Sequence, residues 1–253
     1  MNKGRLILGI GLIVLAGTIF ALSSSANLQF LGLETSNEPE SIITKVNSVK
    51  SIHTIQADGI VDVHIRKSDS EYVRYVFNEK RFKNNSSFNN GILNIKFPSR
   101  NKGFDLFGHS GSGVDVYVSV KSLNQIEMHG VGSVSTDDII KTNNLKLVNE
   151  GTGSMKIDVA AQKIISQNSG VGSMNIKGTA DTATISNQGV GSLDAGELVV
   201  QVLDARNDGV GSLEVRAEKE IRLRNSGVGS LRYSGDAQVI SQRSEGVGSI
   251  SKR

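Results

Sequence analysis

The sequence predicts an all-β protein, a parallel β-helix of about seven to eight coils. The tetrapeptide Gly-x-Gly-Ser recurs seven times between Gly130 and Ser249, and its first glycines are 18 to 21 residues apart. Short runs of alternating apolar and polar residues follow the copies, and no window of a dozen residues has helical periodicity. Such a period is typical of a solenoid, because one repeat cannot bury its apolar face alone.

The N-terminal segment, residues 1–33, predicts one hydrophobic helix ahead of the β-helix. Lys3 and Arg5 precede an uncharged stretch whose most apolar part is Leu6–Leu22, near the lower limit of the roughly 17–25 residues that span a bilayer. It is either an uncleaved membrane anchor or a signal peptide cut after Ala26. Both interpretations predict an extracytoplasmic protein, and the first makes the membrane a partner of this segment.

Two sections lie between this segment and the repeats. Residues 34–50 are polar and predict a tether, whereas residues 51–110 carry alternating runs between Asn- and Ser-rich turns, as strands do. Because residues 51–110 lack the repeat, we expect them to form a β cap over the first coil, with a Gly-rich loop. In that loop Phe104 and Phe107 form a candidate binding tip, or they cover the end of the core.

Residues 111–253 carry the repeats, and Gly111-Ser112-Gly113-Val114 is a degenerate eighth copy. In the copy that begins at Gly170, apolar and polar residues alternate strictly from Met174 onward, which places one set inside and the other outside. Like positions in successive coils should lie about 4.8 Å apart. The glycines are expected at tight corners that need positive φ or a close backbone approach.

Two polar columns follow the same period and are predicted to be structural. An asparagine stands two positions before the first glycine in five consecutive copies, where its amide can bond to its neighbours above and below. These residues are Asn149, Asn168, Asn187, Asn207 and Asn225. A serine ends every copy, and we expect a similar hydroxyl ladder from Ser133, Ser154, Ser173, Ser192, Ser212, Ser230 and Ser249.

Several kinds of chemistry are disfavoured by the composition and by the repeat. A phosphate-binding loop needs a helix after its glycines, but a strand follows here. Calcium-binding β-rolls use nonapeptides with Asp. The absence of Cys excludes disulfides and thiolate metal sites. A net charge of +3 without a basic run predicts no nucleic-acid partner.

Two sets of side chains are the candidates for catalysis or metal binding. Asp194, Glu214 and Arg232 fall in one outward column and are the candidate residues of a polysaccharide-active enzyme. His109 and His129 are about one coil apart, but no further metal ligand accompanies them. We therefore expect no catalytic residues, no metal and no cofactor.

Three further stretches, together with the repeats, carry a family resemblance: Gly59-Ile60-Val61-Asp62-Val63, Asn90 to Ile95, and the ending from Leu231 to Ser249. Over about Ser51 to Arg253 the chain resembles the putative auto-transporter adhesin head domain, also called the GIN domain. It differs in having Ser where the family often has Asp, and Val where the family has Ser between the glycines. The resemblance implies a right-handed β-helix in a bacterial, extracytoplasmic, adhesin-like domain.

The function we expect is binding rather than catalysis. A non-enzymatic surface domain would hold cell-envelope glycan or protein along the flat face of the solenoid. One alternative is an envelope scaffold that self-associates through the open ends of the β-helix, where strand edges can pair with another copy. A polysaccharide-active enzyme is the further alternative.

Overall fold

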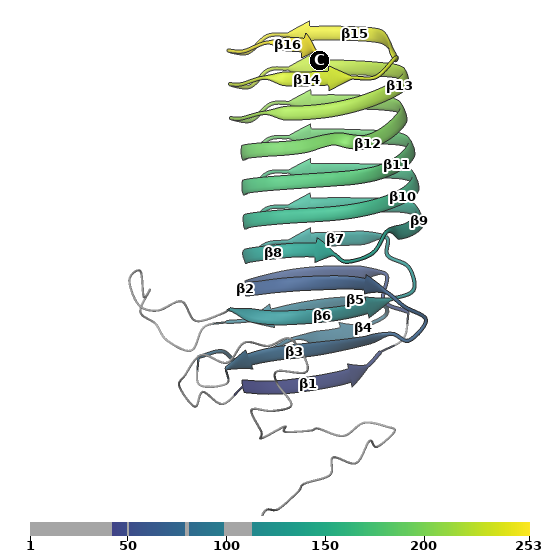
Figure 1. Ribbon diagram of the computed structural model, residues 1–253. Helices are drawn as coiled ribbons and strands as arrows, with labels where there is room; N and C mark the ends of the chain where they lie inside the picture. Colours follow the sequence, from purple (N-terminus) through teal and green to yellow (C-terminus); the bar gives the residue numbers. More distant parts are fainter. Residues whose placement is uncertain (1–41, 50, 79–80, 99–112) are drawn as a thin grey trace, which may run out of the picture.

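Over the residues that the structure describes, the protein is an all-β solenoid, as predicted. The computed structural model describes residues 42–49, 51–78, 81–98 and 113–253, and its regular elements there are all β-strands (Figure 1). Residues 1–33, most of the predicted tether, and Phe104 and Phe107 lie outside the described residues. Within the described ranges, no helix is long and apolar enough to cross a membrane.

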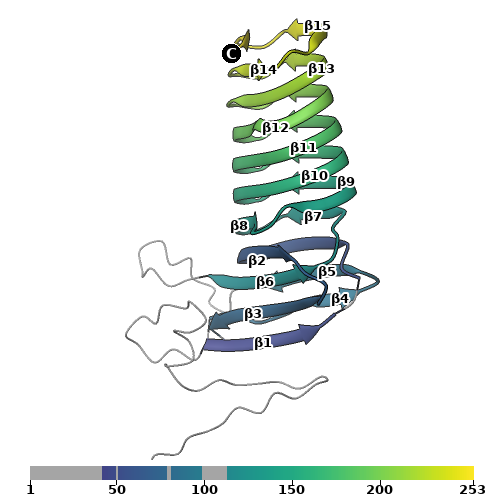
Figure 2. The same ribbon diagram turned by 45° about the vertical axis from the view of Figure 1, so that its right-hand side comes forward.

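The solenoid strands pair with one another in parallel and wind through about seven turns (Figures 1 and 2). In chain order they are β2 (Thr54–Lys67), β5 (Ile92–Phe97), β6 (Val114–Val120), β7 (Gln125–Met128), β8 (Val131–Thr136), β9 (Ile140–Asn149), β10 (Thr152–Asn168), β11 (Val171–Asn187), β12 (Val190–Asn207), β13 (Leu213–Asn225), β14 (Leu231–Ser234), β15 (Gln238–Ser244) and β16 (Ile250–Lys252). From β10 to β13 the pairing follows chain order, and Ser154 pairs with Ser173 as Ser173 pairs with Ser192.

Antiparallel strands lie at the N-terminal end of the stack. They are β1 (Ile42–Ser48), β3 (Tyr72–Asn78) and β4 (Ser87–Asn89). β1 pairs with β3, β3 pairs with β6, and β4 pairs with β5, all in antiparallel fashion. The first parallel coil is thus covered by strands that run the other way (Figure 1).

The strand β2 comes from the predicted cap segment but lies within the stack of coils. Val61 pairs with Val114 of β6 on one side and with Gly132 of β8 on the other, and Ile55 lies in the same way between β5 and β7. β2 is therefore a coil of the solenoid, inserted between two coils that come later in the chain. Residues 51–110 therefore contribute one coil of the stack, β2, in addition to the antiparallel strands over the first coil, because a coil edge can pair with any strand in suitable register.

The predicted eighth copy at Gly111 is corrected. The backbone of Gly59 lies directly beside Gly130 in the stack, and Gly111 and Ser112 lie outside the described residues. Gly113 lies instead beside Ile60, one position out of the expected register. The degenerate copy of the corner is Gly59-Ile60-Val61-Asp62, 71 residues before Gly130-Val131-Gly132-Ser133.

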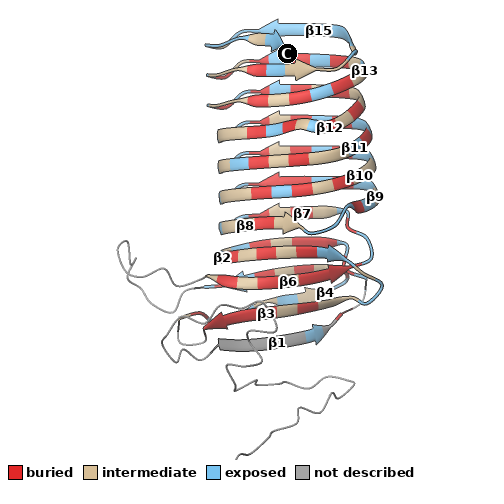
Figure 3. Ribbon diagram, in the orientation of Figure 1, coloured by how far each residue is buried: buried red, intermediate tan, exposed pale blue. Residues whose placement is uncertain are grey.

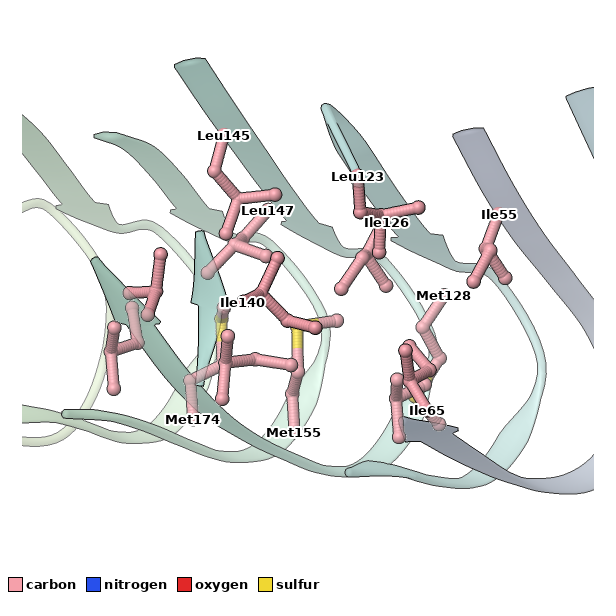
Figure 4. Close-up of a cluster of buried hydrophobic side chains, with 14 of the residues drawn as sticks. Ile55, Ile65, Leu123, Ile126, Met128, Ile140, Leu145, Leu147, Met155 and Met174 are labelled. Atoms are coloured by element: carbon pink, nitrogen blue, oxygen red, sulfur yellow. The ribbon is translucent and has the colours of Figure 1, made fainter. Parts of the chain in front are cut away.

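The core is a set of apolar columns inside the coils. Figure 3 shows the alternation of buried and more exposed residues along β10 to β13, and Figure 4 shows Met155 and Met174 beside Ile140 and Leu147. The column continues through Leu193, Leu213 and Leu231, each at most 1% exposed. Full burial of such a side chain stabilises the fold by about 1.5–3 kcal/mol, so the stack needs no disulfide.

Glycine is required at the corner for two reasons. Gly172 has φ +136°, a conformation that side chains rarely adopt, and a methyl group there would overlap the carbonyl oxygen of Gly153 in the neighbouring coil. The first glycine of each copy makes a similar close approach, as Gly170 does to Gly151. The corner lets successive coils stack at strand spacing without a side chain between them.

Candidate functional site

The five predicted asparagines lie in one buried column and form a continuous ladder. The Nδ2 of each donates to the Oδ1 of the next at 2.8, 2.9, 3.0 and 3.0 Å, from Asn149 through Asn168, Asn187 and Asn207 to Asn225. All five are 0% exposed. Because solvent does not reach the amides, the ladder belongs to the scaffold and is not a binding site.

The predicted hydroxyl ladder of serines does not form. In the part of the chain that the structure describes, no hydrogen bond joins one serine of the column to the next, although the serines pair in register. Ser133 Oγ instead donates to Asp62 Oδ1 at 2.5 Å. A hydroxyl is too short to bridge strands about 4.8 Å apart while its side chain faces outward, whereas the longer asparagine amide can.

One outward column of polar side chains runs along the face that carries β6, β2 and β8. Pairing places its members on successive strands from β3 to β16. We call it the front column, and it consists of Arg74, Tyr117, His64, Ser135, Lys156, Asn175, Asp194, Glu214, Arg232 and Ser251. Hydrogen-bonding groups therefore follow one another at strand spacing along the solenoid.

At the N-terminal end of the front column, stacked rings and charged groups form what we call the His64 cluster. It consists of Arg74, Tyr117, His64 and Ser135 of the column, together with Asp115 beside them. The rings of His64 and Tyr117 are stacked with centroids 4.9 Å apart, and the Arg74 guanidinium carbon lies 4.1 Å from the Tyr117 centroid. Both faces of Tyr117 are thus covered by neighbours. The cluster offers a ligand its edges, namely a hydroxyl, an imidazole and a guanidinium, rather than an open ring face.

His64 is positioned by polar groups on both sides. Its Nε2 lies 3.4 Å from Asp115 Oδ1, and its Nδ1 lies 3.4 Å from Ser135 Oγ. The hydrogen bond with Asp115 raises the pKa of His64 and outweighs burial, which lowers it. Burial and, after it, the Asp115 carboxylate raise the pKa of Tyr117, so this hydroxyl stays protonated at neutral pH.

The order Ser135–His64–Asp115 resembles a nucleophile, a base and a carboxylate in line. Both contacts of 3.4 Å are at the long end for hydrogen bonds. An acyl-transfer site also needs free backbone N–H groups near its serine. Here β8 pairs with β2 on one side and with β10 on the other, so these backbone groups are engaged in the sheet. The cluster is better suited to holding a ligand by hydrogen bonds.

The acidic side chains that were candidates for catalysis already have partners in the structure. Asp194 and Glu214 are neighbours in the front column, as expected. Asp194 Oδ1 accepts from the backbone N–H of Gly196 at 2.9 Å, and Glu214 is ion-paired with Arg253. Both carboxylates therefore already have partners.

His129 lies between Glu150 and Glu127, at 3.0 and 3.4 Å, and His109 falls outside the described residues. Over the described ranges, no group of three or more His, Cys, Asp or Glu could hold a metal ion.

Sequence reasoning missed the His64 cluster because its members come from four strands, β3, β6, β2 and β8. Only the insertion of β2 between β6 and β8 brings them together. The available signal was the glycine corner at Gly59, which has φ +112°. Aligning Gly59 with Gly130 places His64 beside Ser135, because Asp62 then aligns with Ser133.

Comparisons with known proteins give one family and several similar structures. The family model described as putative auto-transporter adhesin, head GIN domain, matches residues 52–237. A putative adhesin from Bacteroides fragilis is 25% identical with a TM-score of 0.76, over 86% of this chain and 98% of its own. A search of curated proteins found no match.

Two structures from Parabacteroides distasonis share the fold. A putative lipid binding protein is 19% identical with a TM-score of 0.64, over 84% of this chain and 96% of its own. A putative adhesin is 22% identical with a TM-score of 0.62, over 85% of this chain and 98% of its own.

Proposed function

The chain belongs to the putative auto-transporter adhesin head GIN domain family, and from this membership we propose an adhesin-like domain that acts outside the cytoplasm by binding cell-envelope glycan through its front column. Family membership supports the adhesin-like character and the surface location. The ligand and the binding residues are our proposal. A test must distinguish a glycan ligand from a protein ligand bound to the same face.

The observation that carries this proposal is the straight front column, with the His64 cluster at one end. A glycan chain offers hydroxyl groups at regular intervals, and a column of donors and acceptors at strand spacing can bond to several of them at once. Tyr117 and Ser135 supply neutral donors and acceptors, His64 supplies an imidazole whose pKa is raised by Asp115, and Arg74 and Asp115 supply one charge of each sign. This mixture favours a hydroxyl-rich ligand over a strongly charged one.

We propose that this binding is not coupled to catalysis. The strand ladders on both sides of β8 support this, because they engage the backbone N–H groups that would have to stabilise an oxyanion beside Ser135. Incubation with envelope polysaccharides and an assay for new reducing ends checks it. Activity lost in Asp194→Ala or Ser135→Ala would overturn this part of the proposal.

Attachment to the membrane through residues 1–33 is a further part of the proposal. It is supported by the apolar stretch Leu6–Leu22 after Lys3 and Arg5. N-terminal sequencing of the exported protein tests it. A mature N-terminus near Ala26 or beyond would favour secretion instead.

The binding experiment uses the full chain on immobilised envelope glycans and, separately, on envelope proteins. Retention on glycan is expected. Tyr117→Phe keeps the ring stack but removes one hydroxyl, and the loss of one hydrogen bond of about 1 kcal/mol weakens binding about fivefold. Thr184→Ala, an exposed change on the other face of the solenoid, is the matched control and should bind like the wild type.

Two results would contradict the glycan proposal. One is retention on envelope proteins alone, which assigns the face to a protein ligand. The other is equal glycan binding by the wild type and by Tyr117→Phe combined with His64→Ala, which moves the site away from the His64 cluster.

A further inference from the structure

The corner of the solenoid carries a row of exposed aliphatic side chains. They occupy the middle position of the repeat and pair in register from coil to coil. We call the row the valine ridge. Its members are Ile60, Val131, Val171, Val190, Val210, Val228 and Val247, which are 43, 50, 52, 52, 51, 51 and 74% exposed. With Thr152 in the remaining place, its eight positions extend over roughly 34 Å.

The fold does not require aliphatic residues at this position. Thr152 pairs in register with Val131 on one side and Val171 on the other. The following glycine, Gly153, has φ +149°, close to the +136° of Gly172. A polar β-branched residue thus fits the corner as well as valine does. Strand propensity accounts for β-branching, but it leaves the repeated choice of an exposed apolar side chain unexplained.

The flanks of the ridge differ from each other. On one side lies the second-glycine column, which is partly exposed and leads to the serines, as at Gly172 and Ser173. On the other side the first glycines are mostly buried, and the next column carries the carboxylates Asp58, Glu150, Asp208 and Glu245. One flank is therefore a neutral trough without side chains, and the other is acidic and polar.

We propose that the valine ridge binds a second copy of this chain, with the ridge of each copy resting in the second-glycine trough of the other. Ridge and trough have the same period because both come from the same repeat, so two copies stay in register over the whole length. A partner with another period would match at only a few points. Identical side chains on stacked strands form dry interfaces of this kind.

The two copies lie parallel, related by a two-fold axis that runs along the ridge. This axis sets the ridge of each copy over the trough of the other and leaves both carboxylate columns on the rim. An axis across the ridge would set ridge on ridge and one carboxylate column on the other, with like charges opposed. Parallel pairing also brings the N-terminal ends of both copies to the same level.

The flanks argue against a lipid surface as the occupant. Interfacial membrane binding by an apolar stripe is normally accompanied by Lys and Arg. The columns beside the ridge carry Ser, Gln, Asp and Glu, and their one basic member, His129, is paired with Glu150. The nearby Lys96, Arg224 and Arg243 are likewise ion-paired, with Asp58 or Glu245 of these columns. The ridge is also only one side chain wide, so the pair should be weak and concentration-dependent.

Cysteine cross-linking tests the geometry directly, because the chain has no cysteine of its own. The full chain, kept in mild detergent, is oxidised as Val131→Cys, as Val247→Cys and as a mixture of the two. Parallel pairing predicts a disulfide dimer within each variant and little mixed dimer. Thr184→Cys, on the other face, is the control and should stay monomeric. Predominantly mixed dimers would overturn the parallel arrangement, and cross-linking no greater than the control would overturn the interface.

Sedimentation over a concentration series tests the role of the side chains. The average mass of the wild type should rise with concentration. Val171→Thr, Val190→Thr, Val210→Thr and Val228→Thr combined should weaken association at least tenfold, with an unchanged unfolding midpoint because Thr152 already occupies this position. Equal association by the two proteins would overturn the proposal. So would a monomeric wild type that binds zwitterionic vesicles through the valines, which would assign the ridge to lipid.

Discussion

The coils from β10 to β13 and the coils around β2 follow the same backbone path but fill their columns differently. In the regular coils, the inner corner column is asparagine on asparagine. At the same register, β7, β2 and β5 carry Met128, Ala57 and Ile95. On the outside, the coils around β2 bring Tyr117 beside His64, whereas the regular coils set single charged or polar residues side by side.

The difference follows from the order in which the coils are stacked. Where coils follow one another in the chain, each column repeats and favours residues that bond to copies of themselves. Where β2 is inserted between later strands, unlike residues from distant parts of the chain become neighbours, and a cluster such as Arg74, Tyr117 and His64 can form. Regular coils therefore supply the scaffold, and the interleaved coils supply the varied chemistry.

The largest effect is expected at the glycine corner of a regular coil. Gly172→Ala should destabilise the protein by about 3 kcal/mol or more, because it combines a positive φ with an overlap against the backbone of Gly153. Gly196→Ala is the matched control, since the nearest atoms to its added methyl group belong to the Glu214 side chain. Urea unfolding measures both variants, and similar losses would contradict the stacking argument.

The second-largest loss of stability is expected when the asparagine ladder is interrupted. Asn187→Ala removes two buried amide hydrogen bonds and leaves Asn168 Nδ2 and Asn207 Oδ1 without these partners, at a cost of about 2–4 kcal/mol. Asn175→Ala, on the same strand but outside the core, should cost less than about 0.5 kcal/mol. Chemical denaturation of the two variants checks the contrast. Equal costs would mean that the ladder adds nothing to the regular coils.

In the interleaved coils, His64 makes stability depend on pH. Its folded pKa is raised, so its contribution is fully present below the unfolded pKa of 6.5 and is lost as pH rises through the higher folded value. His64→Gln should therefore cost about 1 kcal/mol at weakly acidic pH and little at alkaline pH. Unfolding at a series of pH values measures this, and a pH-independent difference would contradict the pairing with Asp115.

The smallest change in stability is expected in the serine column, where two members can be compared. Ser133→Ala should cost up to about 1 kcal/mol, because Ser133 donates to Asp62 of the inserted strand. Ser192→Ala, in a regular coil, should be neutral within about 0.5 kcal/mol. Thermal unfolding of the pair tests whether Ser133 acts with the inserted strand. If Ser133→Ala does not change stability, the hydrogen bond from Ser133 to Asp62 does not stabilise the inserted strand.

The sequence predicted the regular coils because their period is visible in the chain. The glycine corner, the alternation after Ser173 and the asparagine column all repeat, so residues that lie in one column could be matched by counting. The inserted coil could not be found in this way, since β2 has no repeat of its own before it and lies beside Ser133 across 71 residues of chain. The His64 cluster was missed for the same reason.

Exposure was the other feature that counting could not supply. The residue between the two glycines was visible in every copy, but its half-exposed position depends on how sharply the corner turns. The serine and asparagine columns have the same spacing. They differ because the serine side chains are short and face outward, whereas the asparagine side chains face inward and are long enough to bond from coil to coil. Period alone predicts which residues are stacked, and geometry decides which of them bond to one another.

The most direct test of the interleaved order is cross-linking within the chain. In the structure Ile60 pairs with Val131, while Gly113 lies on the far side of β2. Paired Cα atoms about 4.8 Å apart permit a disulfide. With β2 between β6 and β8, Ile60→Cys with Val131→Cys should close an intramolecular disulfide under dilute oxidation, whereas Gly113→Cys with Val131→Cys should not. The reverse result would mean that the coils stack in chain order and would contradict the account.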